Sequence, residues 1–293
     1  MELRVLQYFL AVTREQSISG AAEFLHLSQP TLSRQLKDME EELGKQLFIR
    51  GNRKVTLTEE GMILRKRAEE IMDLVRKTER EISFSDEAIA GDITIGAGET
   101  DGIRLISKAA KKLQTDHPMI HFHIISGDAV TVLEQLDKGL IDFGLLFGSV
   151  DFLKYDHLKI PIQDTWGVLM RRDAPLAKKE SITPEDLKDK PLIVSRQTKE
   201  GHELFEWLKK GAQTPNIAAT YNLVYNGSLM VDEGMGYALC LDKIINTTGS
   251  NLCFRPLKPQ IKIGMNVIWK KYQIFTKAAE KFLANLKDMA GAC

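Results

Sequence analysis

The chain has few of the residues or segments that mark secreted, metal-binding or membrane proteins. It contains three cysteines, Cys240, Cys253 and Cys293, with no CxxC pair and no cluster with histidine, so neither a disulfide framework nor a zinc site is indicated. No stretch approaches the roughly 20 apolar residues of a membrane-spanning helix. The start, MELRVLQYFLAV, is too short and charged for a signal peptide. We therefore expect a cytoplasmic protein without membrane contact.

An excess of charge of one sign is also missing. The 293 residues include 40 basic and 40 acidic side chains, and residues 1–60 hold eight basic against nine acidic. Bulk charge therefore gives no indication of a nucleic-acid partner, and any such argument depends on where individual cations lie. Hydrophobic content of 43% and charged content of 27% are typical of a globular protein with room for two or three domains.

Residues 17–43 have the pattern of two short helices joined by a tight turn. Ser17 or Ser19 can cap the first helix and Ser28 the second, because a serine hydroxyl accepts a hydrogen bond from a first-turn N–H. Pro30 falls in a first turn, where its missing N–H costs nothing. The apolar residues of the second helix recur at helical spacing: Leu32, Leu36, Met39 and Leu43. The side chains predicted to face DNA are Ser28, Gln29, Pro30, Thr31, Ser33, Arg34 and Lys37.

A surface helix with a merely solvated polar face is the alternative interpretation for a single residue such as Arg34. The combination of cap, proline, buried stripe and outward Gln, Ser and Arg favours a helix-turn-helix whose second helix enters the major groove. Residues 48–57 then predict a hairpin around Gly51-Asn52, a pair suited to positive φ. Its cations Arg50, Arg53 and Lys54 could reach phosphates or the minor groove, as in a winged helix-turn-helix.

At this point the chain resembles the LysR-type transcriptional regulators. The matching residues are Ala21-Ala22, Leu25, Ser28-Gln29-Pro30, Ser33, Leu36, Glu40 to Gly44, Leu47-Phe48, Arg50 and Leu57 to Gly61. Gly20 and Leu36 depart slightly from the usual family residues, and neither lies on the expected DNA face. The resemblance implies a mainly α winged helix-turn-helix, a long linker helix and a bilobal α/β effector domain of the type 2 periplasmic-binding-protein class.

A long helix is predicted from Thr58, which can cap it, to about residue 88. Its apolar positions alternate at spacings of four and three, as in a two-helix pairing. The predicted dimerisation residues are Leu64, Ala68, Ile71, Val75, Thr78 and Ile82. The alternative is a helix that packs on its own domain, and the family resemblance favours the dimer.

From Gly91 onward, strand-like and helical segments alternate, which predicts parallel βαβ units. The predicted strands are 92–96, 120–125, 141–147, 191–194, 217–224 and 236–241, and the helices are 102–115, 130–138, 201–210, 228–233 and 275–289. We expect domains at 1–60, 61–90 and 91–293. By resemblance, the chain crosses between lobes near residues 161 and 266, giving lobe one as 92–161 with 267–293 and lobe two as 162–266.

A ligand of such a fold lies beyond the carboxyl ends of the strands. The candidate effector-binding residues are therefore Glu99, Thr100, Asp101, Gly127, Asp128, Phe147, Ser195, Arg196, Thr198 and Asn226. Helix starts at 100–102 and 198–201, with Arg196, could hold an anion. The acids Glu99 and Asp101 oppose that interpretation.

Three alternatives remain open for these acids. Asp101 can be an N-cap, the acids can select a cationic or polyhydroxy effector, or they turn away from the cleft or lock an effector-free state. Ser195 and Thr198 can equally cap their loop.

The leading hypothesis is a regulator that binds double-stranded promoter DNA at an interrupted inverted repeat as a homodimer or homotetramer. A small-molecule effector between the lobes modulates binding, and RNA polymerase is a further partner. The competing hypothesis is an enzyme on the same bilobal fold. The sequence shows no phosphate loop or nucleophile elbow, and an enzyme leaves residues 1–60 unexplained. His121 and His123 have metal-compatible spacing without a third ligand, so an exposed strand edge is preferred. We expect no catalytic residues, metal or cofactor. Cys240 is predicted to lie in the core, with a Cys240–Cys253 redox switch as the alternative.

Overall fold

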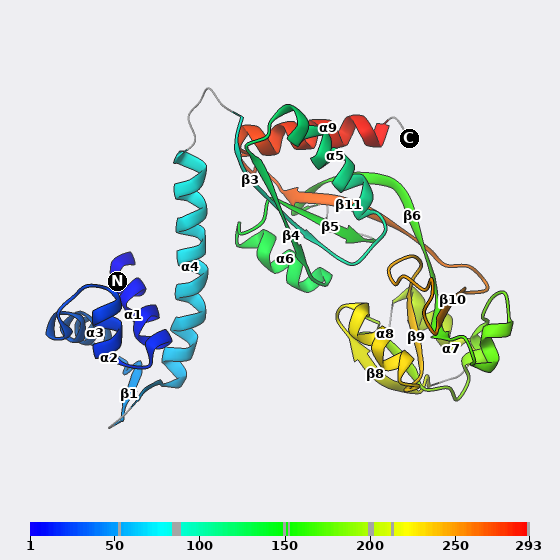
Figure 1. Ribbon diagram of the computed structural model, residues 1–293, viewed down its shortest axis with the longest axis horizontal. Coiled ribbons are helices and arrows are strands. Elements are labelled where there is room, and N and C mark those ends of the chain that lie inside the picture. Colours follow the sequence, from blue (N-terminus) through cyan, green and yellow to red (C-terminus); the bar gives the residue numbers. More distant parts are fainter. Residues whose placement is uncertain are drawn as a thin grey trace. The chain divides into compact units, whose positions relative to one another are not determined.

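The computed structural model describes residues 1–51, 54–83, 89–148, 151, 153–198, 202–211 and 214–291. The chain divides into two compact units, Met1–Ser83 and Phe84–Cys293 (Figure 1). Each unit has its own hydrophobic core. Among the described residues, no helix combines the length and the apolar character needed to cross a membrane.

Unit 1 is built mainly from helices. Its elements are α1 (Leu3–Glu15), α2 (Ile18–Phe24), α3 (Gln29–Leu43), β1 (Phe48–Arg50), β2 (Val55–Leu57) and α4 (Glu59–Ser83). Ser17 Oγ accepts a hydrogen bond from the Gly20 N–H at 3.2 Å, so Ser17 rather than Ser19 caps α2. Ser28 Oγ accepts from the Thr31 N–H at 3.3 Å and caps α3, which confirms that prediction.

The core of unit 1 lies between α1, α2 and α3. Phe9 of α1, Ala21 of α2, and Leu32 and Leu36 of α3 are completely buried in one cluster. The small Ala21 lets the helices approach closely. Leu43, predicted as part of the buried stripe, is 40% exposed, because α3 ends there and Gly44 turns the chain with a positive φ of 64°.

The hairpin and the long helix follow α3. Strands β1 and β2 pair antiparallel, with Phe48 opposite Leu57. Thr58 Oγ1 accepts from the Gly61 N–H at 3.0 Å at the start of α4, as predicted. The predicted helix reaches Ser83 among the described residues, and the predicted residues 84–88 lie outside them.

Part of the predicted dimerisation seam on α4 packs against the core of unit 1. Ala68 is completely buried in the core of unit 1, and Leu64 and Ile71 pack against the same cluster. Within one chain, Ala68 is therefore taken up by packing in unit 1, and the prediction that Leu64 and Ile71 also face a partner helix stays a prediction. Val75 is partly exposed, and Thr78 and Ile82 are exposed.

Unit 2 alternates strands and helices as predicted. Its elements are β3 (Gly91–Ala97), α5 (Ile103–Asp116), β4 (Ile120–Ser126), α6 (Ala129–Asp137), β5 (Phe143–Phe147), β6 (Tyr155–Arg171), the 3₁₀ turns η1 (Pro175–Lys178) and η2 (Pro184–Leu187), β7 (Leu192–Ser195), α7 (Glu203–Lys209), β8 (Ile217–Tyr221), α8 (Val224–Asp232), β9 (Tyr237–Leu241), β10 (Leu252–Pro256), β11 (Lys262–Lys270) and α9 (Lys277–Gly291).

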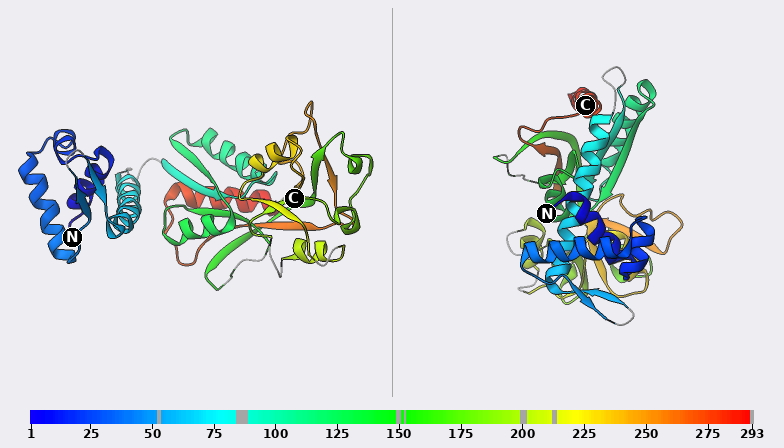
Figure 2. Two further views of the ribbon diagram at one scale, coloured as in Figure 1. Left: turned by 90° about the horizontal axis from the view of Figure 1, so that it is seen from below. Right: turned by 90° about the vertical axis from the view of Figure 1, so that its left-hand side faces the viewer.

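The strands follow the order β4-β3-β5-β11-β6-β9-β7-β8, with β10 paired to β6. β3 pairs parallel with β4 and β5, and β7 with β8 and β9, which confirms the predicted parallel units. In the first half of the sheet, α5 and α9 cover one face and α6 covers the other (Figures 1 and 2). In the second half, α7 and α8 pack against different clusters of the sheet.

The antiparallel strands β6, β10 and β11 were not predicted. The 17-residue β6 pairs with β11 along its first part and with β9 and β10 along its last part, so it runs through both lobes. A β-bulge interrupts the β6–β11 pairing between Gly264 and Met265, opposite the step from Gln163 to Ile160. The exact lobe limits 92–161 with 267–293 and 162–266 stay predictions.

Candidate functional site

The outward face of α3 is the first candidate site. The predicted residues Gln29, Thr31 and Arg34 are exposed, as are Ser28, Pro30 and Lys37, whereas Ser33 is partly buried. Arg34 Nε lies 3.9 Å from Asp38 Oδ2, and the Arg34 side chain is 83% exposed. Ion pairs on a solvated helix contribute little, so they leave such a cation available to DNA.

The basic turn between β1 and β2 is described only in part. Lys54 is exposed. The Arg50 side chain and all of Arg53 lie outside the described residues. Their predicted contacts with DNA therefore stay predictions.

The second candidate site is a cavity of about 360 Å³ between the two lobes of unit 2. Six of the ten predicted effector residues line it: Glu99, Gly127, Asp128, Phe147, Ser195 and Thr198. Gly98, Gly148 and Gln197 also line it and lie at the strand ends that the sequence indicated. Sequence reasoning missed the other lining residues: Ala129, Leu146, Trp166, His202, Tyr221, Asn222, Leu223, Val224, Cys240, Leu241, Ile244 and Ile263. Of these, Trp166 and Ile263 belong to the unpredicted β6 and β11. The volume suits a small metabolite.

Glu99 connects the lobes at this cavity. It follows β3 in lobe one, and its carboxylate accepts a hydrogen bond from the backbone N–H of Val224, the first residue of α8 in lobe two. The N-cap residue Leu223 supplies no side-chain cap, so Glu99 takes that role from the other lobe. Burial raises the pKa of the Glu99 carboxyl above its ordinary value, and the hydrogen bond from Val224 only partly offsets this.

A second carboxylate connects the lobes through Arg196. Asp128 caps α6 by accepting the Thr131 N–H at 3.1 Å, and its other oxygen accepts from Arg196 Nε. The Asp128 side chain is 2% exposed and that of Arg196 is 51% exposed. The hydrogen bond from Arg196 holds the pKa of Asp128 at about 2, against an ordinary 3.8. Arg196, predicted to bind an effector anion and absent from the cavity lining, instead neutralises an acid of its own chain.

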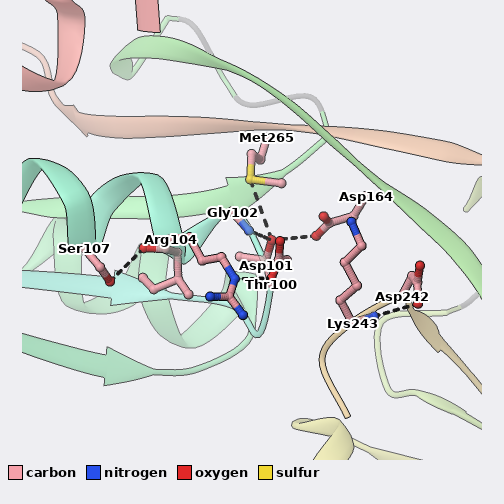
Figure 3. Close-up of polar contacts among 10 residues, drawn as sticks. Thr100, Asp101, Gly102, Arg104, Ser107, Asp164, Asp242, Lys243 and Met265 are labelled. Carbon is pink, nitrogen blue, oxygen red and sulfur yellow. Dashed lines mark hydrogen bonds and ion pairs between the residues drawn. The ribbon is translucent and has the colours of Figure 1, made fainter. Parts of the chain in front are cut away.

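Thr100 and Asp101 turn away from this cavity. Figure 3 shows Thr100 directed toward Asp164 and Met265, and its Oγ1 lies 2.5 Å from Asp164 Oδ2. Both residues are buried, and this burial raises the pKa of the Asp164 carboxyl. Arg104 Nε donates to Asp101 at 2.6 Å, so Asp101 is an ion-pair partner and Gly102 is the N-cap of α5.

These two residues line an open hollow of about 690 Å³ beside α5, which adjoins the cleft cavity and shares Gly98, Glu99 and Ile244 with its wall. The prediction that both contact the effector in the cleft is corrected on this observation. The interpretation of Asp101 as an N-cap is wrong as well.

Two other predictions about the cleft are corrected. Asn226 is exposed and does not line the cavity, because α8 begins at Val224 and Asn226 lies within the helix. The helix expected from residue 201 begins at Glu203, and His202 Nδ1 caps it by accepting the Leu204 N–H at 3.2 Å. Because this helix end is capped and is followed by the acidic Glu203, it does not form an anion-binding site.

Several side chains complete the cavity wall. Thr198 is 7% exposed, and among the described residues, which exclude the adjoining 199–201, its Oγ1 finds no hydrogen-bond partner. Burial lowers the pKa of His202, and since Nδ1 accepts a hydrogen bond, the neutral ring carries its proton on Nε2. Burial raises the pKa of the Cys240 thiol to about 12, so Cys240 is a core residue and not an activated thiol.

Comparison with protein families gives two matches that together span most of the chain. The model described as bacterial regulatory helix-turn-helix protein, lysR family, matches residues 3–62, and the LysR substrate binding domain matches residues 86–291. The HTH-type transcriptional regulator BsdA of Bacillus subtilis (strain 168) is 33% identical over 199 residues, 67% of each chain. The Hca operon transcriptional activator HcaR of Escherichia coli (strain K12) is 27% identical over 295 residues, 98% of each chain.

Solved structures share the fold. CbnR, a LysR family transcriptional regulator, has a TM-score of 0.76 at 19% identity, with 99% of both chains covered. Full-length CbnR complexed with its target DNA has a TM-score of 0.75 at 18% identity, with 99% of this chain and 100% of that chain covered.

Proposed function

Because the chain belongs to the LysR family of bacterial transcriptional regulators, with a helix-turn-helix domain and a substrate-binding domain, we propose how its two units carry out regulation. A homodimer or homotetramer binds an interrupted inverted repeat in promoter DNA, and a small effector in the cleft cavity modulates that binding. The exposed polar face of α3, held by the Ser28 cap and the buried Leu32 and Leu36, carries this proposal.

The first turns of α3 enter the major groove. Gln29 and Arg34 are placed to contact base edges, since Gln pairs with adenine and Arg with guanine, while Thr31 and Lys37 contact phosphates or bases. The basic turn 50–54 contacts the flanking phosphates or the minor groove. The LysR family model over residues 3–62 supports this role.

The effector acts through the cavity of unit 2. A ligand shifts an equilibrium only if it binds two states with different affinity, and a cavity whose walls come from both lobes meets that requirement when the lobes close. Two hydrogen-bonded pairs already cross it, Glu99 with Val224 and Asp128 with Arg196. The exposed part of α4 contributes to assembly.

We assign the protein no catalytic activity and a cytoplasmic location, where promoter DNA and RNA polymerase are found. The related proteins BsdA and HcaR bear names of transcriptional regulators, which supports a regulator over an enzyme.

Selection of DNA from a pool of random duplexes by the full chain tests the proposal. We expect an interrupted inverted repeat. Arg34→Ala should weaken binding to that repeat by roughly 1–3 kcal/mol and relax the sequence preference at one position of each half-site. Lys108→Ala, an exposed cation of α5 in the other unit, is the charge-matched control. Equal weakening on all sequences, with a smaller salt slope, would make Arg34 a phosphate contact instead.

A further inference from the structure

The cleft cavity has an unusual charge for a site expected to hold small metabolites. Among the described residues that line it, the acids are Glu99 and Asp128, and none is lysine or arginine. Burial favours the neutral form of the nearby His202, so this ring adds no positive charge. Arg196 compensates Asp128, whereas the partner seen for Glu99 is the uncharged N–H of Val224. The ionised Glu99 carboxylate therefore gives the described wall a net negative charge, one that burial disfavours and that a cation would compensate.

The position of Glu99 makes this charge decisive for ligand choice. The N-terminal end of a helix offers unpaired N–H groups and a partial positive charge, which attract carboxylates and phosphates. In this cleft the Glu99 carboxylate already occupies that end of α8. An anionic ligand would have to displace Glu99 and then lie beside it, with the repulsion of two like charges in a half-buried site.

The rest of the wall shows what the cavity accepts. Phe147 and Trp166 supply aromatic surface, and Ile263 adds aliphatic surface from β11. The Thr198 hydroxyl is more than nine-tenths buried and has no partner within the described part of the chain, so a ligand can supply a hydrogen bond to it there. Tyr221 does not compete for that role, since its hydroxyl donates to the Leu239 carbonyl at 2.6 Å.

We infer that the cavity binds a small organic amine, with its apolar or aromatic body against Phe147 and Trp166 and its ammonium group at Glu99, and that it rejects carboxylates of the same shape. This inference rests on the proposed function, which makes the cavity the effector site. An ammonium donates to carboxylate oxygens that the Val224 N–H leaves free, because each carboxylate offers about four acceptor positions. It also compensates a buried negative charge.

Three probes of nearly identical shape and different charge test the inference: phenethylamine, 2-phenylethanol and 3-phenylpropionate. Each is titrated at millimolar concentrations into the full chain, and thermal unfolding is followed by tryptophan fluorescence. We expect a saturable rise in midpoint with the amine, binding roughly tenfold or more weaker for the alcohol, and no rise with the acid.

Two variants assign the discrimination to the cavity. Glu99→Gln keeps an oxygen that can accept from Val224 but removes the charge, and it should weaken the amine roughly tenfold and allow the acid to bind. Asp101→Asn removes a charge from the same loop outside the cavity and should change neither. The inference is overturned if the acid binds the unmodified chain as well as the amine does, if no amine binding is detected, or if Glu99→Gln leaves the preference intact.

Gel-shift titration of the selected DNA repeat with the same probes tests the proposed function separately from the inferred ligand class. An amine that binds the cavity without changing DNA affinity would refute the proposed function and leave the ligand class standing. An acid that binds the cavity and changes DNA affinity would refute the ligand class and leave the proposed function standing.

Discussion

The ion pair between Asp128 and Arg196 gives the most direct quantitative test of the closed cleft. Asp128→Asn removes the charge but keeps the α6 cap, since asparagine caps a helix about as well as aspartate. Arg196→Gln removes the other partner. Combining the two changes in a double-mutant cycle isolates the energy of the pair from the effects of each single change.

The magnitude follows from the pKa of Asp128. Lowering that pKa from 3.8 to about 2 corresponds to at most about 2.5 kcal/mol, at about 1.4 kcal/mol for each tenfold change. Because the Arg196 side chain is half exposed, solvent screens the pair and reduces this value. We therefore expect a coupling free energy of about 1 kcal/mol at pH 7.

The pH dependence has a definite sign. The folded-state pKa of Asp128 lies below its ordinary value, so the stabilisation is fully present above about pH 4 and is lost as the pH falls toward about 2. The Asp128→Asn variant should lack this part of the acid sensitivity.

Urea unfolding of the full chain, followed by tryptophan fluorescence, measures these effects. The three tryptophans, Trp166, Trp207 and Trp269, are buried in unit 2, so their signal reports this unit and not the DNA-binding one. A coupling energy of zero at pH 7, with each single variant costing the same in both backgrounds, would refute the argument that Arg196 holds Asp128 across the cleft.

The structure also sets the direction in which three further substitutions change stability. Gly61→Ala should destabilise unit 1 by roughly 1–3 kcal/mol, because the new Cβ would lie 2.2 Å from the Leu47 carbonyl oxygen. Gly20→Ala should stabilise unit 1 by up to about 1 kcal/mol, because the atom nearest to its new Cβ is 3.5 Å away and alanine favours a helix. Hydrogen exchange of the α3 amides measures both, and equal effects would contradict the close approach at Gly61. Thr198→Val should raise the unfolding free energy of unit 2 by roughly 1 kcal/mol, since it removes a buried hydroxyl that has no partner among the described residues. A decrease in the tryptophan-monitored urea midpoint would show that the hydroxyl has a partner in solution.

The DNA-binding domain could be predicted in detail because its signals are local. The Ser28 cap, Pro30 in the first turn and the buried Leu32 and Leu36 all lie within one helix, and the structure confirms each of them. The parallel strands β3 and β4 were also predictable, since each is followed by a helix, and β5 was predictable as a short apolar run.

The effector cleft could be predicted only in outline. Candidates chosen at the ends of strands placed Glu99, Asp128 and Thr198 on its wall. What those side chains do depends on contacts that sequence patterns do not encode: Glu99 and Val224 are 125 residues apart, and Asp128 and Arg196 are 68 apart. Thr100 points away from the cavity because its hydroxyl donates to Asp164. Asp164 lies on β6, a strand that the pattern of apolar and polar residues did not predict.

That strand, β6, escaped prediction because its first part mixes charged and apolar residues and includes Pro161. Its stability comes from pairing with β11, β9 and β10, which lie 80 or more residues away for much of its length. Non-local pairing of this kind leaves a weak local pattern.

A continuous β6 also limits how the lobes can move. Since a hydrogen-bonded ribbon of β6 and β11 connects the lobes, we expect opening and closing to occur as a change of twist at the bulge beside Gly264 rather than as a swing about loops. Gly264 has no neighbouring atom within 4 Å of where a Cβ would be, so the ribbon has room to twist there.

Such a motion keeps the ladder hydrogen bonds, so the contacts that distinguish the open from the closed state are those across the cleft, Glu99 with Val224 and Asp128 with Arg196. A weakly held metabolite can then change which state predominates, because the population ratio responds to the difference in affinity between states and not to affinity itself. A bulged ribbon thus lets a metabolite of modest affinity change the lobe arrangement, as long as it binds one arrangement more tightly than the other.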